Sequence, residues 1–61
     1  MRHTMQPAQW STMLHRLMAL ITRADDEDEI VVHSEAMKVL GQRYLEIHFP
    51  DKKIVWIVEE K

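Results

Sequence analysis

Apolar residues recur with a helical period from Pro7 to about Ala24. Proline suits the first turn of a helix, where its missing N–H would have no intrahelical partner. Polar residues fall on the opposite face, so this segment predicts one long amphipathic helix packed on a core. Residues 1–6 are polar and predict a flexible N-terminal tail. The apolar stripe comprises Trp10, Met13, Leu14, Leu17, Met18, Leu20, Ile21 and Ala24.

Five consecutive carboxylates, residues 25–29, follow the helical pattern. Negative charges at a helix C-terminus repel one another and oppose the helix dipole, so we expect the helix to end before them. The run predicts an exposed loop. The next residues, 29–33, include β-branched Ile30, Val31 and Val32, which predict a short strand.

Residues 34–41 allow two interpretations. Ser34 resembles an N-cap, and Gly41, the only glycine, could end a helix in the left-handed conformation. These two residues predict a short helix over 35–40. The alternative is a wide connection between strands, with Gly41 at a β-bulge.

Two apolar runs flank the sequence Phe-Pro-Asp-Lys at residues 49–52, and Pro50 suits the second position of a type I turn. This pattern predicts a β-hairpin over about 43–59. Its simplest register places Phe49 opposite Ile54, Ile47 opposite Trp56 and Leu45 opposite Val58, all on the core face. A longer loop with a bulge would shift this register by one residue and reverse one strand.

These elements predict a single small α+β domain over residues 7–61. The long N-terminal helix would pack across a small antiparallel sheet, made of the strand at 29–33 and the hairpin at 43–59. A chain of 61 residues buries only roughly 60% of its unfolded surface, so its stability margin is small. Disulfides are excluded because the chain has no cysteine. We therefore expect a homodimer or a stable partner to add the missing buried surface.

The second face of the predicted hairpin is the first candidate for that contact. If Ile54, Trp56 and Val58 face the helix, then Val55 and Ile57 face away from it, beside Tyr44. Exposed β-branched residues forgo a few kcal/mol, at roughly 25 cal/mol per Å² of apolar surface. We interpret this face as a partner-binding surface. The alternative is that the short helix or the N-terminal arm covers it.

The acidic loop is the second candidate. Asp25, Asp26, Glu27 and Asp28 could dock a basic partner or imitate a phosphate backbone. Such charge runs more often keep a small domain soluble. The spacing does not match a calcium-binding loop, since the alternating ligands and the turn glycine are missing.

Nucleic-acid binding is the alternative function. Arg16 and Arg23 share the polar face of the predicted helix, and Lys38 and Arg43 could extend a basic edge. Acidic residues outnumber basic ones by ten to eight, and the net charge of −2 provides no general attraction to phosphates. Protein binding is therefore the better interpretation.

Catalysis is not expected. The chain has no glycine-rich phosphate loop, no cysteine nucleophile and no spacing typical of metal ligands among its four dispersed histidines. His33 and Ser34 are neighbours in a predicted strand, so their side chains would point to opposite faces. We expect no catalytic residue, no metal site and no cofactor.

Taken together, the sequence predicts a small non-catalytic protein that binds another protein as an accessory factor or inhibitor. Small regulators of this kind are frequent in phages and mobile elements, and a dimeric nucleic-acid-binding regulator is the alternative. No stretch has the length and apolarity to span a membrane, and the N-terminus lacks the apolar core of a secretion signal. We therefore expect a cytoplasmic protein.

Overall fold

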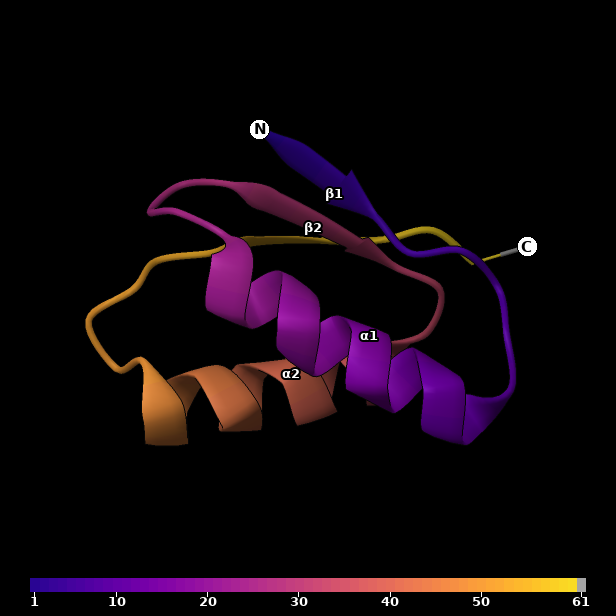
Figure 1. The fold of residues 1–61 in the computed structure, drawn as a ribbon. Helices are drawn as coiled ribbons and strands as arrows, with labels where there is room; N and C mark the ends of the chain where they lie inside the picture. Colours follow the sequence, from indigo (N-terminus) through magenta and orange to yellow (C-terminus); the bar gives the residue numbers. More distant parts are fainter. Residues whose placement is uncertain (61) are drawn as a thin grey trace.

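The computed structural model describes residues 1–60, which form two helices and three strands in strictly alternating order (Figure 1). The order is β1, α1, β2, α2 and β3. Their bounds are Arg2–Thr4 for β1, Trp10–Arg23 for α1, Glu29–Val32 for β2, Glu35–His48 for α2 and Val55–Val58 for β3.

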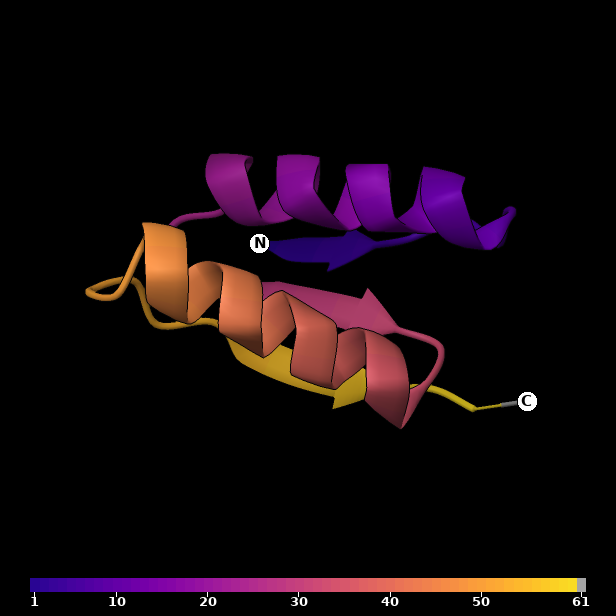
Figure 2. The same cartoon turned by 90° about the horizontal axis from the view of Figure 1, so that it is seen from below.

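The sheet has the order β1-β2-β3, and both neighbouring pairs of strands are parallel. Ile30 at its centre lies opposite His3 of β1 and Trp56 of β3. Because each crossover moves to the next strand in the same direction and crossovers share one hand, both helices lie on the same side of the sheet (Figures 1 and 2). The prediction of an antiparallel sheet with a hairpin is therefore wrong, although the α+β composition is retained.

The error arises at residues 43–48, which belong to α2 and not to a strand. Ser34 does cap this helix, since its Oγ accepts a hydrogen bond from the Met37 N–H at 3.2 Å. The helix passes through Gly41 and ends at His48, and the N–H of the following residue, Phe49, donates to the Leu45 carbonyl. Buried Met37 and Gly41 and half-buried Leu45 follow at helical spacing, so the apolar pattern was compatible with a helix throughout.

Gly41 has a packing role in place of the predicted helix-ending role. A Cβ atom at this position would collide with the Trp56 ring, with Cη2 closest and Cζ3 at 2.8 Å, and would lie 3.2 Å from Leu17 Cδ2. The missing side chain therefore lets the indole of β3 lie directly against the α2 backbone. Glycine in a helix interior costs about 1 kcal/mol, and here the cost is offset by this close approach.

The core lies between the helices and the sheet. Its fully buried apolar members come from α1, β2, α2 and the residues that directly follow β1 and α1, and β3 adds partly buried Trp56 and Val58. Met5, directly after β1, is also buried, so the segment predicted as a flexible tail contributes both a strand and a core residue. The buried cluster comprises Met5, Leu17, Ile21, Ala24, Ile30, Val32 and Met37.

The turn predicted at residues 49–52 is present, but it joins a helix to a strand. The Lys52 N–H donates to the Phe49 carbonyl at 3.0 Å. The Lys52 side chain then reaches across to α1, where Nζ donates to the carbonyls of Ile21 at 3.0 Å and Thr22 at 3.3 Å. A cation at these unpaired carbonyls complements the C-terminal end of the helix.

Candidate interaction surface

One face of the sheet carries no helix. Side chains alternate along each strand, and Ile30 and Val32 join the buried cluster between helices and sheet, so Val31 points to the other face. The strand register then places Thr4 and Ile57 on either side of Val31, and Arg2 and Val55 on either side of Glu29. We call this surface the open face; it comprises Arg2, Thr4, Glu29, Val31, Val55 and Ile57.

The open face is apolar on its β3 side and charged at one corner. Val55 exposes 46% of its surface, while Val31, in the central strand, exposes only 1%. At the amino-terminal end, Arg2 Nε donates to Glu29 Oε1 at 3.2 Å, and both side chains are partly exposed. Such an exposed pair contributes little to stability, on the order of 0–1 kcal/mol. Its charges remain accessible from solvent.

Tyr44 does not join Val55 and Ile57 on the open face. It lies in α2, on the helical side of the molecule, where its ring packs against His48 with centroids 4.4 Å apart and against Phe49 at 6.3 Å. The predicted partner-binding set thus divides, with Val55 and Ile57 on the open face and Tyr44 among the residues packed on the core. The hairpin prediction had placed Tyr44 on a strand.

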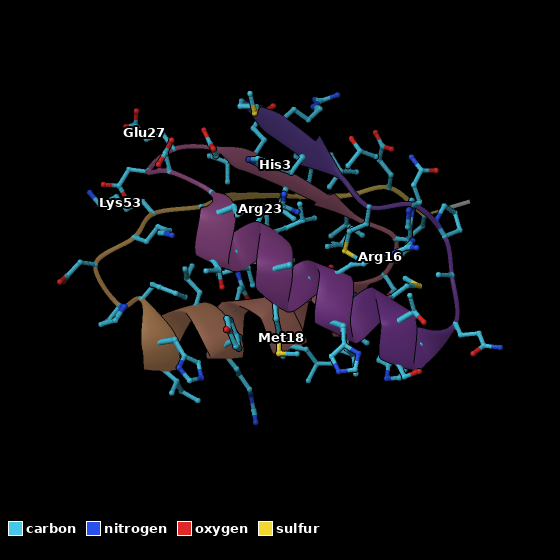
Figure 3. All side chains as sticks on the ribbon, in the orientation of Figure 1. His3, Arg16, Met18, Arg23, Glu27 and Lys53 are labelled. Carbon is cyan, nitrogen blue, oxygen red and sulfur yellow. The ribbon has the colours of Figure 1, made fainter. Side chains whose placement is uncertain are left out.

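The acidic loop also divides. Asp25 and Glu27 are exposed, and Glu27 adopts a left-handed backbone with φ of 71°. Asp26 Oδ1 accepts a hydrogen bond from the Lys53 N–H at 2.9 Å, and the Glu27 N–H donates to the Lys53 carbonyl at 2.6 Å. These two bonds fasten the loop to the segment before β3 (Figure 3).

Asp28 is the buried member of the acidic run, and its carboxylate has three partners within the chain. Oδ1 accepts from the amino group of Met1 at 2.9 Å, and Oδ2 accepts from the Asp25 N–H at 3.0 Å. The His3 ring nitrogen Nε2 lies 3.0 Å from Oδ2. This carboxylate therefore holds β1 against the start of β2 and is not available to a partner protein.

These contacts shift two pKa values in opposite directions. The hydrogen bond from the Met1 ammonium, followed by those from the Asp25 N–H and from His3, holds the pKa of the Asp28 carboxyl well below its usual range. The same bond to Asp28 raises the pKa of the Met1 amino group. Both shifts favour the charged forms, so this ion pair is strongest at neutral pH.

The basic residues proposed for nucleic-acid binding lie in two places. Arg16 and Arg23 border a shallow hollow beside β1, together with Thr4 and Gln6 (Figure 3). Lys38 and Arg43 lie on α2, and Lys38 Nζ is 3.6 Å from Glu35 Oε1. The structure brings the two arginines together but does not join all four residues into one stripe.

The histidines do not converge. His33 Nε2 lies 2.9 Å from the Met5 carbonyl oxygen, while His48 stacks on Tyr44. Among residues 1–60 there is no group of three or more His, Asp or Glu side chains with the geometry of a metal site. Within the same range, neither helix has the length and apolarity needed to cross a bilayer.

Sequence reasoning missed a second apolar surface, on the helices. Ile47 exposes 74% and Leu40 exposes 40% of its surface, and their spacing of seven places them on one side of α2. Met18 of α1 lies between the two helices in Figure 3. Continuing the helical pattern from Met37 and Gly41 past residue 41 would have shown that Ile47 falls outside the buried face.

Comparison of the chain with protein-family models, with curated proteins and with solved structures yields no match. The function must therefore be argued from the surfaces described above.

Proposed function

We propose that this chain is a non-catalytic protein-interaction module that binds another protein through the open face. The supporting observation is an all-parallel sheet with helices on one side only. Parallel sheets are covered on both faces in nearly all known proteins, because their strands are apolar on both sides. β2 and β3 follow this rule, with Ile-Val-Val at residues 30–32 and Val-Trp-Ile-Val at residues 55–58, yet no helix of residues 1–60 covers the second face.

The partner suited to this surface has an apolar patch that packs on Val55 and Ile57. The charged corner formed by Arg2 and Glu29 would orient it, since rim charges contribute more to specificity than to affinity. The acidic loop has a smaller part in this proposal, because Asp26 and Asp28 are engaged within the chain. Asp25, Asp26 and Glu27 are exposed, but of these only Asp25 and Glu27 have carboxylates without a hydrogen bond in the described part of the chain.

Nucleic-acid binding is the less favoured function. Arg16 and Arg23 are exposed on α1, but the chain is acidic overall and Lys38 is engaged with Glu35. Affinity for nucleic acid depends on many phosphate contacts acting together. Retention of DNA or RNA in a low-salt filter-binding assay, abolished by Arg16→Glu and Arg23→Glu together, would replace the proposal.

The test of the open face is a double substitution, Val55→Thr with Ile57→Thr. Threonine has the shape of valine, is one heavy atom smaller than isoleucine and keeps a high β propensity, so we expect the fold to persist while the apolar surface is lost. The variant and the wild-type chain, both immobilised, are compared for the proteins that they retain from an extract of the native host. We expect the wild-type chain to retain a specific protein and the variant to lose at least nine-tenths of it.

The matched control is Ile47→Thr, which makes the same type of change at an exposed apolar residue on the helical side. It should retain the partner as the wild-type chain does. Equal retention by all three chains would contradict the proposal. Loss of the partner by the Ile47→Thr variant alone would mean that the binding surface lies on the helices.

A further inference from the structure

β3 is an edge strand whose backbone is half unpaired. The Val55 N–H donates to the Asp28 carbonyl and the Glu59 N–H donates to the Val32 carbonyl, both at the β2 side. In a parallel ladder, alternate residues direct both backbone groups to the same neighbour. The N–H and C=O groups of Ile54, Trp56 and Val58 therefore point outward, where the described residues provide no further strand.

The sequence around this edge is self-complementary in charge. Residues 52–60 read Lys-Lys-Ile-Val-Trp-Ile-Val-Glu-Glu, with two cations before the strand, two anions after it and Trp56 at the centre. An identical strand placed antiparallel and centred on Trp56 brings the basic end of each copy to the acidic end of the other. A parallel alignment would instead place like charges together.

We propose that a second copy of this chain pairs with β3 along this edge, antiparallel and centred on Trp56, to form a continuous six-stranded sheet. Trp56 pairs with Trp56 of the second copy, and Ile54 pairs with Val58. These are the residues with outward-pointing backbone groups, and each such pair exchanges two bonds, about six in all. The pairing also removes an exposed, uncharged strand edge, which soluble proteins generally protect.

The side chains on the open face then match as well. Val55 lies opposite Ile57 of the second copy, and Lys53 lies opposite Glu59. All four are in odd-numbered positions; when the alternation of β3 is continued by two residues before it and one after it, Lys53 and Glu59 lie on the same side of the sheet as Val55 and Ile57, and all four form the closer, non-hydrogen-bonded pairs of the ladder. Lys53 and Glu59 are exposed, and Lys53 lies at the molecular end visible in Figure 3. The charge complementarity therefore identifies both the occupant and the register.

The helices allow this approach. α2 packs against both β2 and β3, so the two copies of α2 would be separated by two strand spacings, about 10 Å. That separation is a normal packing distance for helices. A shallow groove lies between α2 and the segment that leads into β3, lined by Leu45, Glu46 and Trp56 among others, and the side chains of the second α2 would lie beside it.

This inference is independent of the identity of the partner proposed above, although the pairing would join two open faces into one larger surface. The two proposals are distinguished by different measurements. Retention of another protein by the variant with Val55→Thr and Ile57→Thr tests the open face, whereas self-association of variants at Lys53 and Glu59 tests the pairing of the two copies.

The experiment is a charge exchange measured by sedimentation equilibrium at low salt. In a homodimer, Lys53→Glu alone or Glu59→Lys alone places like charges at both pairs formed by position 53 of one copy and position 59 of the other, which we call the rim pairs. We expect each variant to raise the dissociation constant about tenfold. An equimolar mixture of the two variants restores opposite charges at both rim pairs, and we expect it to dimerise as the wild-type chain does. Arg16→Glu, an equal charge change far from β3, should leave the dissociation constant unchanged.

The register is tested separately with cysteines, since the chain contains none. Val55→Cys mixed with Ile57→Cys should form a disulfide-linked dimer faster than either variant alone, because position 55 faces position 57 of the second copy. A wild-type chain that is monomeric at high micromolar concentration would overturn the proposal. So would a mixture of charge variants that dimerises no better than its components.

Discussion

The two faces of the sheet differ in what buries them. Ile30 and Val31 are neighbours on β2, and both are almost fully buried. Ile30 belongs to the core cluster that includes residues of both helices, whereas Val31 lies outside that cluster, between Thr4 of β1 and Ile57 of β3 on the face that no helix covers. Two neighbouring residues therefore have the same exposure on faces of the sheet that are built differently.

The largest expected effect contrasts these two neighbours. Ile30→Ala leaves a cavity that the surrounding helices cannot close, so we expect a loss of about 3 kcal/mol in the free energy of unfolding. Val31→Ala removes two carbons, on the face that no helix covers, and should cost about 1.6 kcal/mol at about 0.8 kcal/mol per buried CH₂. Urea denaturation of both variants measures the difference.

A domain of this size has a total stability of only a few kcal/mol, so Ile30→Ala could be unfolded from the outset. Ile30→Val, expected to cost about 1 kcal/mol, then provides the measurable value. Equal losses in the free energy of unfolding per carbon removed at positions 30 and 31 would mean that the open face is covered in solution.

An intermediate effect on stability is expected where α2 contacts the face of the sheet that the helices cover. Gly41→Ala gains about 1 kcal/mol of helix propensity but drives a methyl group into the Trp56 ring. Overpacking of this kind costs about 1–3 kcal/mol, and the ring is held between α2 and the sheet, so we expect a net loss of about 1 kcal/mol. The thermal midpoint of unfolding measures it.

The matched variant is Gly41→Ala combined with Trp56→Leu, which removes the colliding ring. In the Trp56→Leu background, the alanine should stabilise the chain, because only its propensity gain remains. A destabilising effect of similar size in both backgrounds would show that Trp56 is not the reason for the glycine.

The smallest effect concerns the end of the sheet, where Asp28 holds β1. Because the pKa of its carboxyl is lowered on folding, Asp28 stabilises the fold above about pH 4, and this contribution is lost as the pH falls further. The raised pKa of the Met1 amino group has the opposite sign, so its contribution is lost as the pH rises above about 8.

We therefore expect Asp28→Asn to lower stability at pH 7. The variant's stability should also depend less on pH, both below about pH 4 and above about pH 8. Denaturant midpoints measured from pH 3 to pH 9 would show this flattening. Asp25→Asn is the control, since its side chain is exposed and should leave the profile nearly unchanged. An unaltered profile for Asp28→Asn would exclude the ion pair as its source.

Much of the first half of the fold could be predicted from the sequence. The periodic stripe located α1 to within a few residues, and the β-branched run located β2. β1 could not be recognised, because Arg2–Thr4 has no apolar signal and is a strand only through its pairing with β2. Val55 and Ile57 were predicted to face away from the helical layer, and they do.

The second half was predicted less well for a physical reason. Residues 43–48 alternate in a way that fits a strand, and they also continue the helical spacing of Met37 and Gly41. A short segment with both patterns is decided by what it packs against. Here that partner is Trp56, whose ring occupies the space left by Gly41.

The sequence by itself determined the cap at Ser34, the turn at residues 49–52, the position of α1 and the apolar character of both faces of β3. These properties are local, because they depend on residues a few positions apart. The tertiary structure alone decided that the strands are parallel, that α2 continues to His48 and that both helices lie on one side of the sheet. Those choices depend on contacts between residues distant in the sequence, and they leave the open face and the β3 edge exposed.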